Sequence, residues 1–291
     1  VYGAGAFAPG FLSWYYRSSW QSKGGYKMAL FEYEKKEQDH YAIFTLNRPD
    51  RLNAMGMAMQ DERKKVMEDF NADDNMFAAI VTGAGEKAFS SGGDLIEMAE
   101  MAKQGKAPTE MDPRSIEFFF PFHRPDTCPK PIIAAINGLA VGGGCELALS
   151  CDVRIIAENG YLGQFEVKRG LIPGFAVCNL VRLMPFGEAM YYLLTADRIT
   201  PQEAVRLGLV HKAVPQAELM PEAERIAKMI CDNAPLAVSA SKAVATYYRN
   251  IFLAEQGFYM NKFFHDVHSS EDAKEGPVAF AEKRKPTWKR K

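Results

Sequence analysis

Short apolar runs that end in turn residues constrain the fold of this chain more than any other feature. Each run is rich in β-branched or small apolar residues, a pattern typical of buried strands. We expect strands at Tyr41–Leu46, residues 78–82, Ile132–Ile136 and Val153–Ala157. Residues 57–70 have the apolar spacing of an amphipathic helix. Strands that alternate with helices need crossover connections, so the sequence predicts an α/β fold with mostly parallel pairing.

The chain is long enough for one large core with a smaller appended unit, because 47% of its 291 residues are hydrophobic. Residues 1–27 lack acidic residues, and Gly and Pro interrupt their apolar positions, so we expect an N-terminal extension outside the fold. We assign residues 28–220 to a core that carries the active site. Residues 221–291 should form a C-terminal helical region that breaks at 233–235. Residues 97–129 should form a mobile loop followed by a helix.

Several classes of function are disfavoured by composition. The net charge of -1 argues against a nucleic-acid partner, and no apolar run is long enough to span a membrane. Five cysteines without a C-x-x-C pair indicate reduced thiols in a cytoplasmic protein. The five histidines form no tight ligand pair, so we expect no metal site. Six of the last nine residues are basic, which is typical of a solvated tail. The more specific alternative is that these residues contact phosphate groups.

Two glycine-rich stretches, each placed directly after an expected strand, are the first candidate functional elements. Residues 137–148 contain Gly142, Gly143 and Gly144 and open a probable helix, where free N–H groups stabilise developing negative charge. Tight packing of that helix onto a strand is the alternative interpretation. The second stretch ends in Gly93 and Asp94. It also fits a tight turn in which Asp94 caps a helix.

Two glutamates are the candidate acid and base. Glu146 lies in the first turn of a small, apolar helix, and Glu166 follows 20 residues later. An apolar setting raises the pKa of a carboxyl group toward the range useful for general acid–base catalysis. Alternatively, Glu146 is only a favourable charge near a helix N-terminus, and Glu166 a surface residue. Cys145 is a weaker candidate nucleophile, since a neighbouring glutamate disfavours a thiolate.

Taken together, these stretches resemble the crotonase (enoyl-CoA hydratase/isomerase) superfamily over about residues 31–291. The resemblance is carried by motifs in the right order, which are Leu46-Asn47-Arg48-Pro49, Leu52-Asn53-Ala54, Gly92-Gly93-Asp94, Gly142-Gly143-Gly144, Ser270-Glu271-Asp272-Ala273-Lys274-Glu275-Gly276 and Phe280-Ala281-Glu282-Lys283-Arg284. The tail is also similar to that of carnitinyl-CoA dehydratases.

The resemblance implies a spiral core of repeated ββα units with a C-terminal helical trimerisation region, as a homotrimer or a hexamer built as a dimer of trimers. It implies an acyl-CoA thioester substrate whose oxygen is held by the N–H groups of Gly93 and Gly143. Coenzyme A is part of the substrate, and no other cofactor is implied. The implied CoA-binding residues are Leu52, Ala54, Gly93, Asp94, Leu95 and Ile96. Lysines near the C-terminus are expected to meet the CoA phosphates.

The resemblance implies an enoyl-CoA hydratase, a hydro-lyase that uses Glu146 and Glu166 for reversible syn addition of water to a trans-2-enoyl-CoA. The alternatives are Δ3-Δ2 enoyl-CoA isomerisation, other acyl-CoA enolate chemistry or a non-catalytic role such as RNA binding. Three departures from the common pattern stand near the expected site. Glycine occupies position 93, where alanine is common, and Phe165 replaces a frequent proline. Residues 175–183 replace the usual Gly-Gly-Thr-Gln-Arg-Leu, so they do not predict a plain short-chain acyl group.

Overall fold

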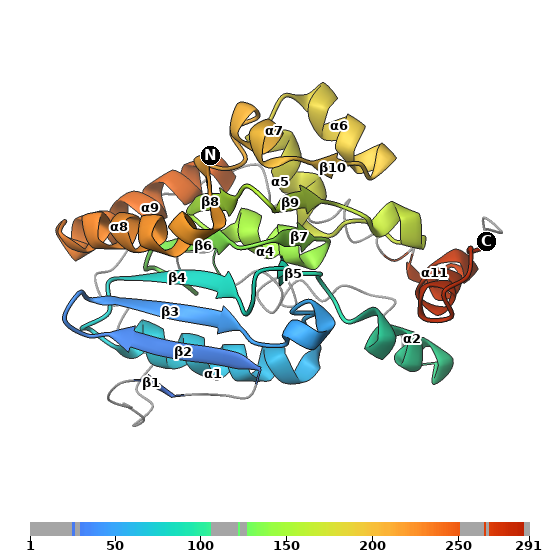
Figure 1. Cartoon of the computed structure of the whole chain (residues 1–291), viewed down its shortest axis with the longest axis horizontal. Coiled ribbons are helices and arrows are strands. Elements are labelled where there is room, and N and C mark those ends of the chain that lie inside the picture. Colours follow the sequence, from blue (N-terminus) through green and yellow to red (C-terminus); the bar gives the residue numbers. More distant parts are fainter. Residues whose placement is uncertain are drawn as a thin grey trace, which may run out of the picture.

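The computed structural model describes residues 25–26, 30–105, 122, 127–250, 265 and 268–287. Its larger sheet has the strand order β1-β2-β3-β4-β6-β8-β11 (Figure 1). These strands are β1 (Gly25–Tyr26), β2 (Phe31–Lys36), β3 (Tyr41–Leu46), β4 (Ala78–Gly83), β6 (Ile132–Ile136), β8 (Val153–Ala157) and β11 (Lys212–Val214). The pairs from β3 to β11 are parallel, whereas β1, β2 and β3 pair antiparallel. Mostly parallel pairing is therefore confirmed.

A smaller sheet has the strand order β10-β9-β7-β5. Its strands are β5 (Ala88–Ser90), β7 (Leu139–Val141), β9 (Tyr161–Gly163) and β10 (Arg198–Ile199). Strands β5, β7 and β9 each follow a strand of the larger sheet along the chain, so successive units place one strand in each sheet. This alternation agrees with the ββα repeat that the resemblance implied. The three-residue strands were not predicted from the sequence. One of them, β7, lies inside the glycine-rich stretch.

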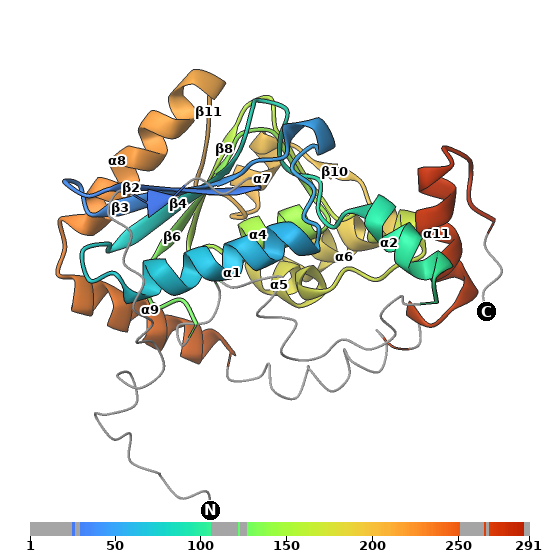
Figure 2. The ribbon, with the colours of Figure 1, turned by 90° about the horizontal axis from the view of Figure 1, so that it is seen from below.

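Helices cover both faces of the larger sheet (Figures 1 and 2). The helices are α1 (Met57–Ala72), α2 (Leu95–Lys103), α4 (Gly143–Ser150), α5 (Phe175–Leu183), α6 (Phe186–Thr195), α7 (Pro201–Arg206), α8 (Leu219–Cys231), α9 (Pro235–Asn250) and α11 (Glu271–Ala281), with short 3-10 helices η1 (Pro49–Arg51), η2 (Glu166–Arg169) and η3 (Gln216–Glu218). Phe44 of β3 packs in the cluster with α1, and its neighbour Ile43 packs in the cluster with α8. Alternate residues of one strand thus enter two separate cores.

The expected strands and helices agree closely with these elements, apart from two regions. The expected loop over residues 97–129 is wrong at its start, since residues 97–103 belong to α2. Residues 106–121 and 123–126 lie outside the described part. Residues 25–26, at the end of the segment that we placed outside the fold, pair with β2. The break expected at 233–235 is confirmed, because it separates α8 from α9.

Within the described ranges, no helix has the length and apolar character needed to cross a membrane. The same residues contain no group of three or more His, Cys, Asp or Glu placed to hold a metal ion.

Candidate functional site

The two glycine-rich stretches lie against each other, as an oxyanion hole requires. A methyl group added to Gly143 would stand 3.5 Å from the backbone nitrogen of Gly93, and one added to Gly92 would stand 2.8 Å from the nitrogen of Gly143. Gly92 has a φ of +89°, which a residue with a side chain rarely adopts. The fold therefore brings the N–H groups of Gly93 and Gly143 side by side.

Both of these N–H groups lie where regular structure offers no acceptor. Gly143 is the first residue of α4, so its N–H has no carbonyl in its own helix. The N–H of Met55 donates to the carbonyl of Gly92 at 2.8 Å, and the N–H of Asp94 donates to the carbonyl of Met55 at 3.4 Å. The N–H of Gly93, between Gly92 and Asp94, takes no part in this pairing. Within the described ranges, the structure records no protein acceptor for either group.

Gly144 shows that the alternative interpretation of the glycine run, tight helix packing, also holds. A methyl group on Gly144 would stand 2.2 Å from the carbonyl oxygen of Ser90, so α4 packs directly on the backbone of β5. Adjacent glycines thus have different functions, since Gly144 allows close packing while Gly143 presents an N–H.

The segments expected to bind CoA run beside each other. The N–H of Ser91 donates to the carbonyl of Leu52 at 2.9 Å, which aligns residues 52–55 with residues 91–94. Leu52 and Ile96 are partly exposed, at 37% and 40%, whereas Ala54 is buried. Leu95 is half-buried at the start of α2. These residues form a strip of backbone and apolar side chains next to Gly93.

Asp94 acts as the helix cap that the sequence offered as its alternative role. Its carboxylate accepts hydrogen bonds from the N–H groups of Ile96 and Glu97, at 3.0 and 3.2 Å. It also pairs with Arg48 at 2.7 Å. Burial acts to raise the pKa of Asp94, but these contacts outweigh it and the pKa is lowered. The carboxylate therefore holds α2 in place, which in turn positions Gly93.

Glu146 is buried and points from α4 to the beginning of α5. Its Oε1 accepts a hydrogen bond from the N–H of Ala176 at 2.8 Å. Burial raises the pKa of Glu146 to about 7, although the N–H groups of Ala176, Gly174 and Phe175 act in the opposite direction. The glutamate is thus more than a favourable charge at the N-terminus of its own helix, since it contacts the N-terminus of another one.

Glu166 begins η2 and is only half-buried. A methyl group on Gly142 would stand 3.1 Å from its Oε1, so its carboxylate lies against the residue that precedes Gly143. Burial, followed by the negative charge of Glu146, raises the pKa of Glu166 to about 8. Glu166 is thus partly exposed, as the alternative of a surface residue has it, and its carboxylate also lies against the glycine loop. The two carboxylates interact with each other beside the glycine loops.

Two contributors to this site were not anticipated from the sequence. Gln164 is buried, and in the orientation that satisfies both side chains its amide nitrogen donates to the two carboxylate oxygens of Glu166, at 3.2 and 3.1 Å. The N–H groups at the start of α5 hold Glu146. Gly174, the residue before that helix, was the available signal, because free N–H groups at a helix N-terminus attract a carboxylate.

Cys145 is buried, which raises the pKa of its thiol to about 12 and makes it a poor nucleophile.

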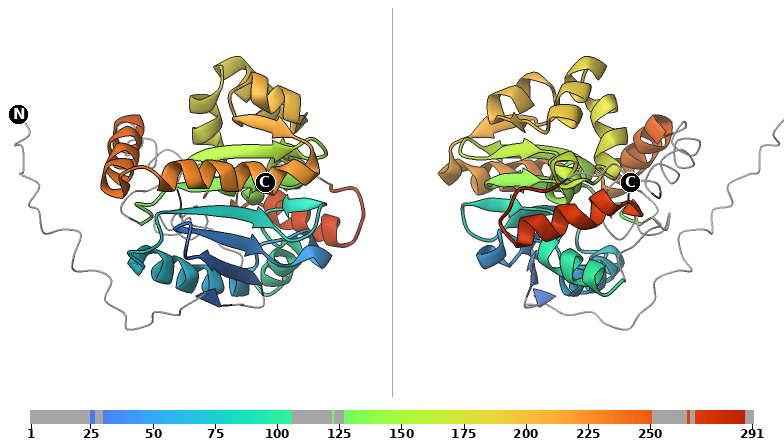
Figure 3. Two further views of the ribbon diagram at one scale, coloured as in Figure 1. Left: turned by 60° about the vertical axis from the view of Figure 1, so that its left-hand side comes forward. Right: turned by 90° about the vertical axis from the view of Figure 1, so that its right-hand side faces the viewer.

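The C-terminal helix α11 packs against the elements that carry both halves of the site. It contacts α2, which follows Gly93, and η2, which begins at Glu166 (Figures 2 and 3). At the contact with η2, a methyl group on Gly276 would stand 1.6 Å from the carbonyl oxygen of Arg169. Arg169 also stacks on Phe280, 4.5 Å from the ring centre. Arg284 of the basic tail pairs with Glu275 and Glu282, so this residue stabilises the tail itself.

Two adjacent glycine loops beside a pair of interacting carboxylates, on a core of ββα units, match what an enzyme of the crotonase type would need. Comparison with known proteins supports this class. The family model described as "Enoyl-CoA hydratase/isomerase" matches residues 36–291. The chain therefore belongs to the enoyl-CoA hydratase/isomerase family, and the predictions of a crotonase-superfamily member and of a hydro-lyase are confirmed.

Individual relatives agree with this assignment over most of their length. The short-chain-enoyl-CoA hydratase of Clostridium acetobutylicum is 39% identical over 252 residues, covering 86% of this chain and 94% of that protein. The carnitinyl-CoA dehydratase of Escherichia coli K12 is 38% identical over 251 residues, covering 84% and 93%. The crystal structure of carnitinyl-CoA hydratase from Mycobacterium avium superposes with a TM-score of 0.77 at 34% identity, covering 91% and 100%.

Proposed function

We propose that this protein catalyses the reversible syn addition of water to a trans-2-enoyl-CoA, with Glu146 and Glu166 as the acid–base pair. The observation that carries the proposal is the position of two carboxyl groups of raised pKa beside the N–H groups of Gly93 and Gly143. Relatives named as enoyl-CoA hydratases and carnitinyl-CoA dehydratases support the same reaction class.

The proton balance of this reaction matches the charge state of the pair. Water adds its oxygen to C3 of the acyl group, while a proton is added to C2. One carboxylate accepts a proton from water, and the other carboxylic acid donates a proton to C2. With pKa values of about 7 and about 8, the coupled pair holds about one proton at a pH between these two values.

The two N–H groups would stabilise the intermediate charge. As water attacks C3, electron density moves to the thioester oxygen and forms an enolate. Donors that are already oriented toward this oxygen cost no reorganisation when the charge develops, and removal of one such donor typically costs ~10²–10³ in turnover. The strip formed by Leu52, Ala54 and residues 93–96 would hold the CoA. Hydration leaves the overall oxidation state of the substrate unchanged, so we propose no redox or metal cofactor. The trimer or hexamer implied by the resemblance stays a prediction.

Turnover of crotonyl-CoA, followed by loss of the absorbance of the conjugated thioester, tests the proposal. We expect Glu146→Gln and Glu166→Gln each to lower turnover by at least about 10²-fold, since each removes a positioned acid or base. Glu158→Gln is the matched control, because Glu158 is exposed and lies outside the site. Turnover that survives both site substitutions would rule out the two-glutamate mechanism. Isomerisation of a 3-enoyl-CoA without hydration would instead favour the isomerase alternative.

A further inference from the structure

The 3-10 helix η2, which carries Glu166, is a single turn at the surface of the molecule. Its four residues, Glu166–Arg169, are all partly or fully exposed. The N–H of Leu171 donates to the carbonyl of Glu166 at 3.0 Å, and Gly170 closes the turn with a φ of +71°. This closure makes the turn one unit, so a displacement of Arg169 at one end displaces Glu166 at the other.

Two basic side chains of η2 attach this turn to two different helices. Lys168 Nζ donates to the carbonyl of Ala196, directly after α6, at 2.6 Å. Arg169 contacts α11 instead, where its guanidinium carbon lies 4.5 Å from the centre of the Phe280 ring. A guanidinium over an aromatic ring is attracted by the negative face of the ring. Because the side chains of η2 are not buried in a core, contacts of this kind determine where the turn lies.

The backbone of Arg169 fits against α11 as well. A methyl group on Gly276 would stand 1.6 Å from the carbonyl oxygen of Arg169, so the two elements reach this distance only with glycine at position 276. Arg169 therefore contacts α11 through its backbone and through its side chain.

The same helix is attached to the other half of the site. Its residues Ala273, Pro277 and Ala279 are buried, and it packs against α2 (Figures 2 and 3). The cap of α2 is Asp94, which directly follows Gly93. Through α11, the turn that carries Glu166 is thus connected to the helix that follows Gly93.

We propose that Arg169 is a positioning residue for Glu166, and that α11 is the brace through which Arg169 fixes Glu166 relative to Gly93. The inference rests on the proposed function, in which Glu166 transfers a proton while Gly93 binds the thioester oxygen. A catalytic acid or base must lie within about 2.6–3.2 Å of the atom with which it exchanges the proton. A misplacement of about 1 Å can cost on the order of 10² in rate.

Hydrogen exchange at the N–H of Leu171, which closes the turn, tests whether α11 holds η2. We expect Arg169→Met and Phe280→Leu each to speed this exchange about two- to fivefold, because each removes the contact between guanidinium and ring. Phe280→Tyr keeps the aromatic face and should exchange like the wild type. An equal exchange rate in all four proteins would overturn the inference.

Steady-state kinetics with the enoyl-CoA that the wild type hydrates fastest test whether the brace acts on Glu166. Arg169→Met should lower kcat about tenfold and change KM less than about twofold, since the displaced group takes part in the chemical step. Adding Phe280→Leu should cost little more, because both changes remove one contact. In the Glu166→Gln background, Arg169→Met should lower kcat less than about twofold. Phe280→Tyr, the conservative variant, should keep the kcat of the wild type.

The kinetic outcomes separate this inference from the proposed function. A raised KM with an unchanged kcat in Arg169→Met would show that Arg169 acts on substrate binding, and would overturn the inference. A tenfold loss of kcat that persists in the Glu166→Gln background would overturn it too. If Glu166→Gln lowers turnover and Arg169→Met does not, the inference fails and the proposed function stands. If Glu166→Gln keeps the turnover of the wild type, the proposed function fails and the inference fails with it.

Discussion

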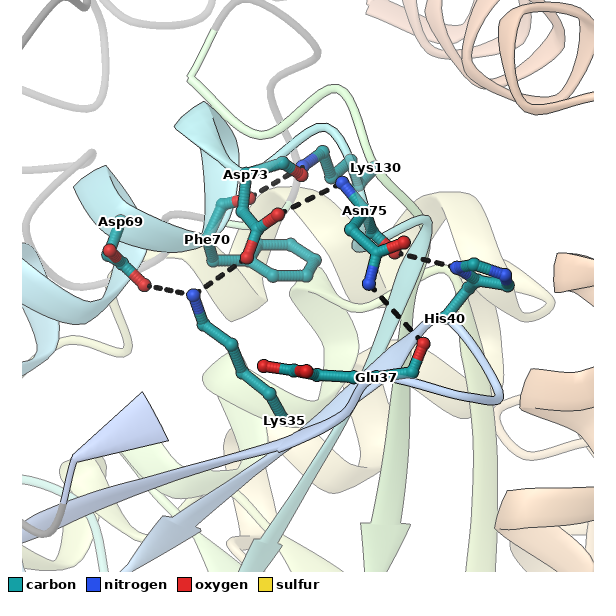
Figure 4. Close-up of polar contacts among 8 residues, drawn as sticks. All are labelled: Lys35, Glu37, His40, Asp69, Phe70, Asp73, Asn75 and Lys130. Carbon is teal, nitrogen blue, oxygen red and sulfur yellow. Dashed lines mark hydrogen bonds and ion pairs between the residues drawn. The ribbon is translucent and has the colours of Figure 1, made fainter. Parts of the chain in front are cut away.

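Two pairs of carboxylates in this molecule differ in what lies beside them. Asp69 and Asp73, at the end of α1, surround Lys35 of β2, whose Nζ lies 2.9 and 2.7 Å from them (Figure 4). Glu146 and Glu166 have no cation between them; they face backbone N–H groups, an amide and each other.

The presence of the cation decides the direction of the pKa shift. Burial acts to raise the pKa of Asp73, but the hydrogen bond from Lys35 and the one from the N–H of Asn75 outweigh it, and the pKa is lowered. For Glu146 and Glu166 nothing outweighs burial, and the pKa values rise to about 7 and about 8. A buried carboxyl group without a neighbouring cation has a raised pKa, and it can therefore transfer protons at neutral pH.

The network around Lys35 serves the fold. Lys130, just before β6, donates to the carbonyl oxygens of Phe70 and Asp73 at 2.5 and 2.7 Å and so caps the end of α1 (Figure 4). Burial lowers the pKa of Lys130 to about 8. His40 and Asn75 extend the contacts, since the carbonyl of Asn75 lies 3.0 Å from His40 Nδ1. These polar groups tie α1 to β2 and β6, far along the sheet from the glycine loops.

We expect the largest effect on stability when the cation Lys35 is removed from the pair formed by Asp69 and Asp73. Lys35→Met leaves Asp69 and Asp73 without their cation, so we expect a loss of about 3–5 kcal/mol in the free energy of unfolding. Denaturation in urea measures it. Lys36→Met, which removes a partly exposed lysine paired with the exposed Glu34, should cost less than about 1 kcal/mol. Equal losses in the two variants would show that Lys35 does not hold the pair together.

An intermediate effect concerns the pH dependence of stability at Glu146. Its pKa is raised from the ordinary value to about 7 in the folded protein, so the folded state binds more protons and wild-type stability falls as the pH rises from about 4.5 to 7. A glutamine side chain at this position does not titrate. Glu146→Gln should therefore be more stable than the wild type by on the order of 2 kcal/mol at pH 8, and by less than half of that at pH 5. A difference that is independent of pH would contradict the raised pKa.

The smallest expected effect comes from placing a cation beside the second pair. Gln164→Lys puts an ammonium group next to Glu166 and should lower the pKa at which the pair loses its shared proton. We expect the alkaline limb of the pH–rate profile to move down by about one pH unit or more, and turnover at pH 8 to fall about tenfold. Gln164→Met is the control for packing, and its alkaline limb should not move down. An unchanged limb in the lysine variant would mean that Gln164 does not face Glu166.

Apolar runs in the sequence predicted the secondary structure correctly where a buried segment ends at a turn. Strands β3, β6 and β8 have the bounds expected from their apolar runs, because each run ends at a turn residue. Asp94 and Ser270 cap helices, as short polar side chains before helical segments indicate. By contrast, the extent of α2 was missed, since residues 97–103 were assigned to a loop although Asp94 had been considered as a helix cap.

For the candidate site, the sequence by itself determined which residue types stand at which points of the chain. Glu146 was identified from its small, apolar neighbours, whereas the choice of Gly93 and Gly143 rested on the resemblance to the crotonase superfamily. Only the tertiary structure decided that the two loops touch, that α5 presents its N–H groups to Glu146 and that Gln164 faces Glu166. Hydrogen bonds and charge interactions depend on distances of a few ångströms between segments far apart in the chain, and local sequence patterns do not encode those distances.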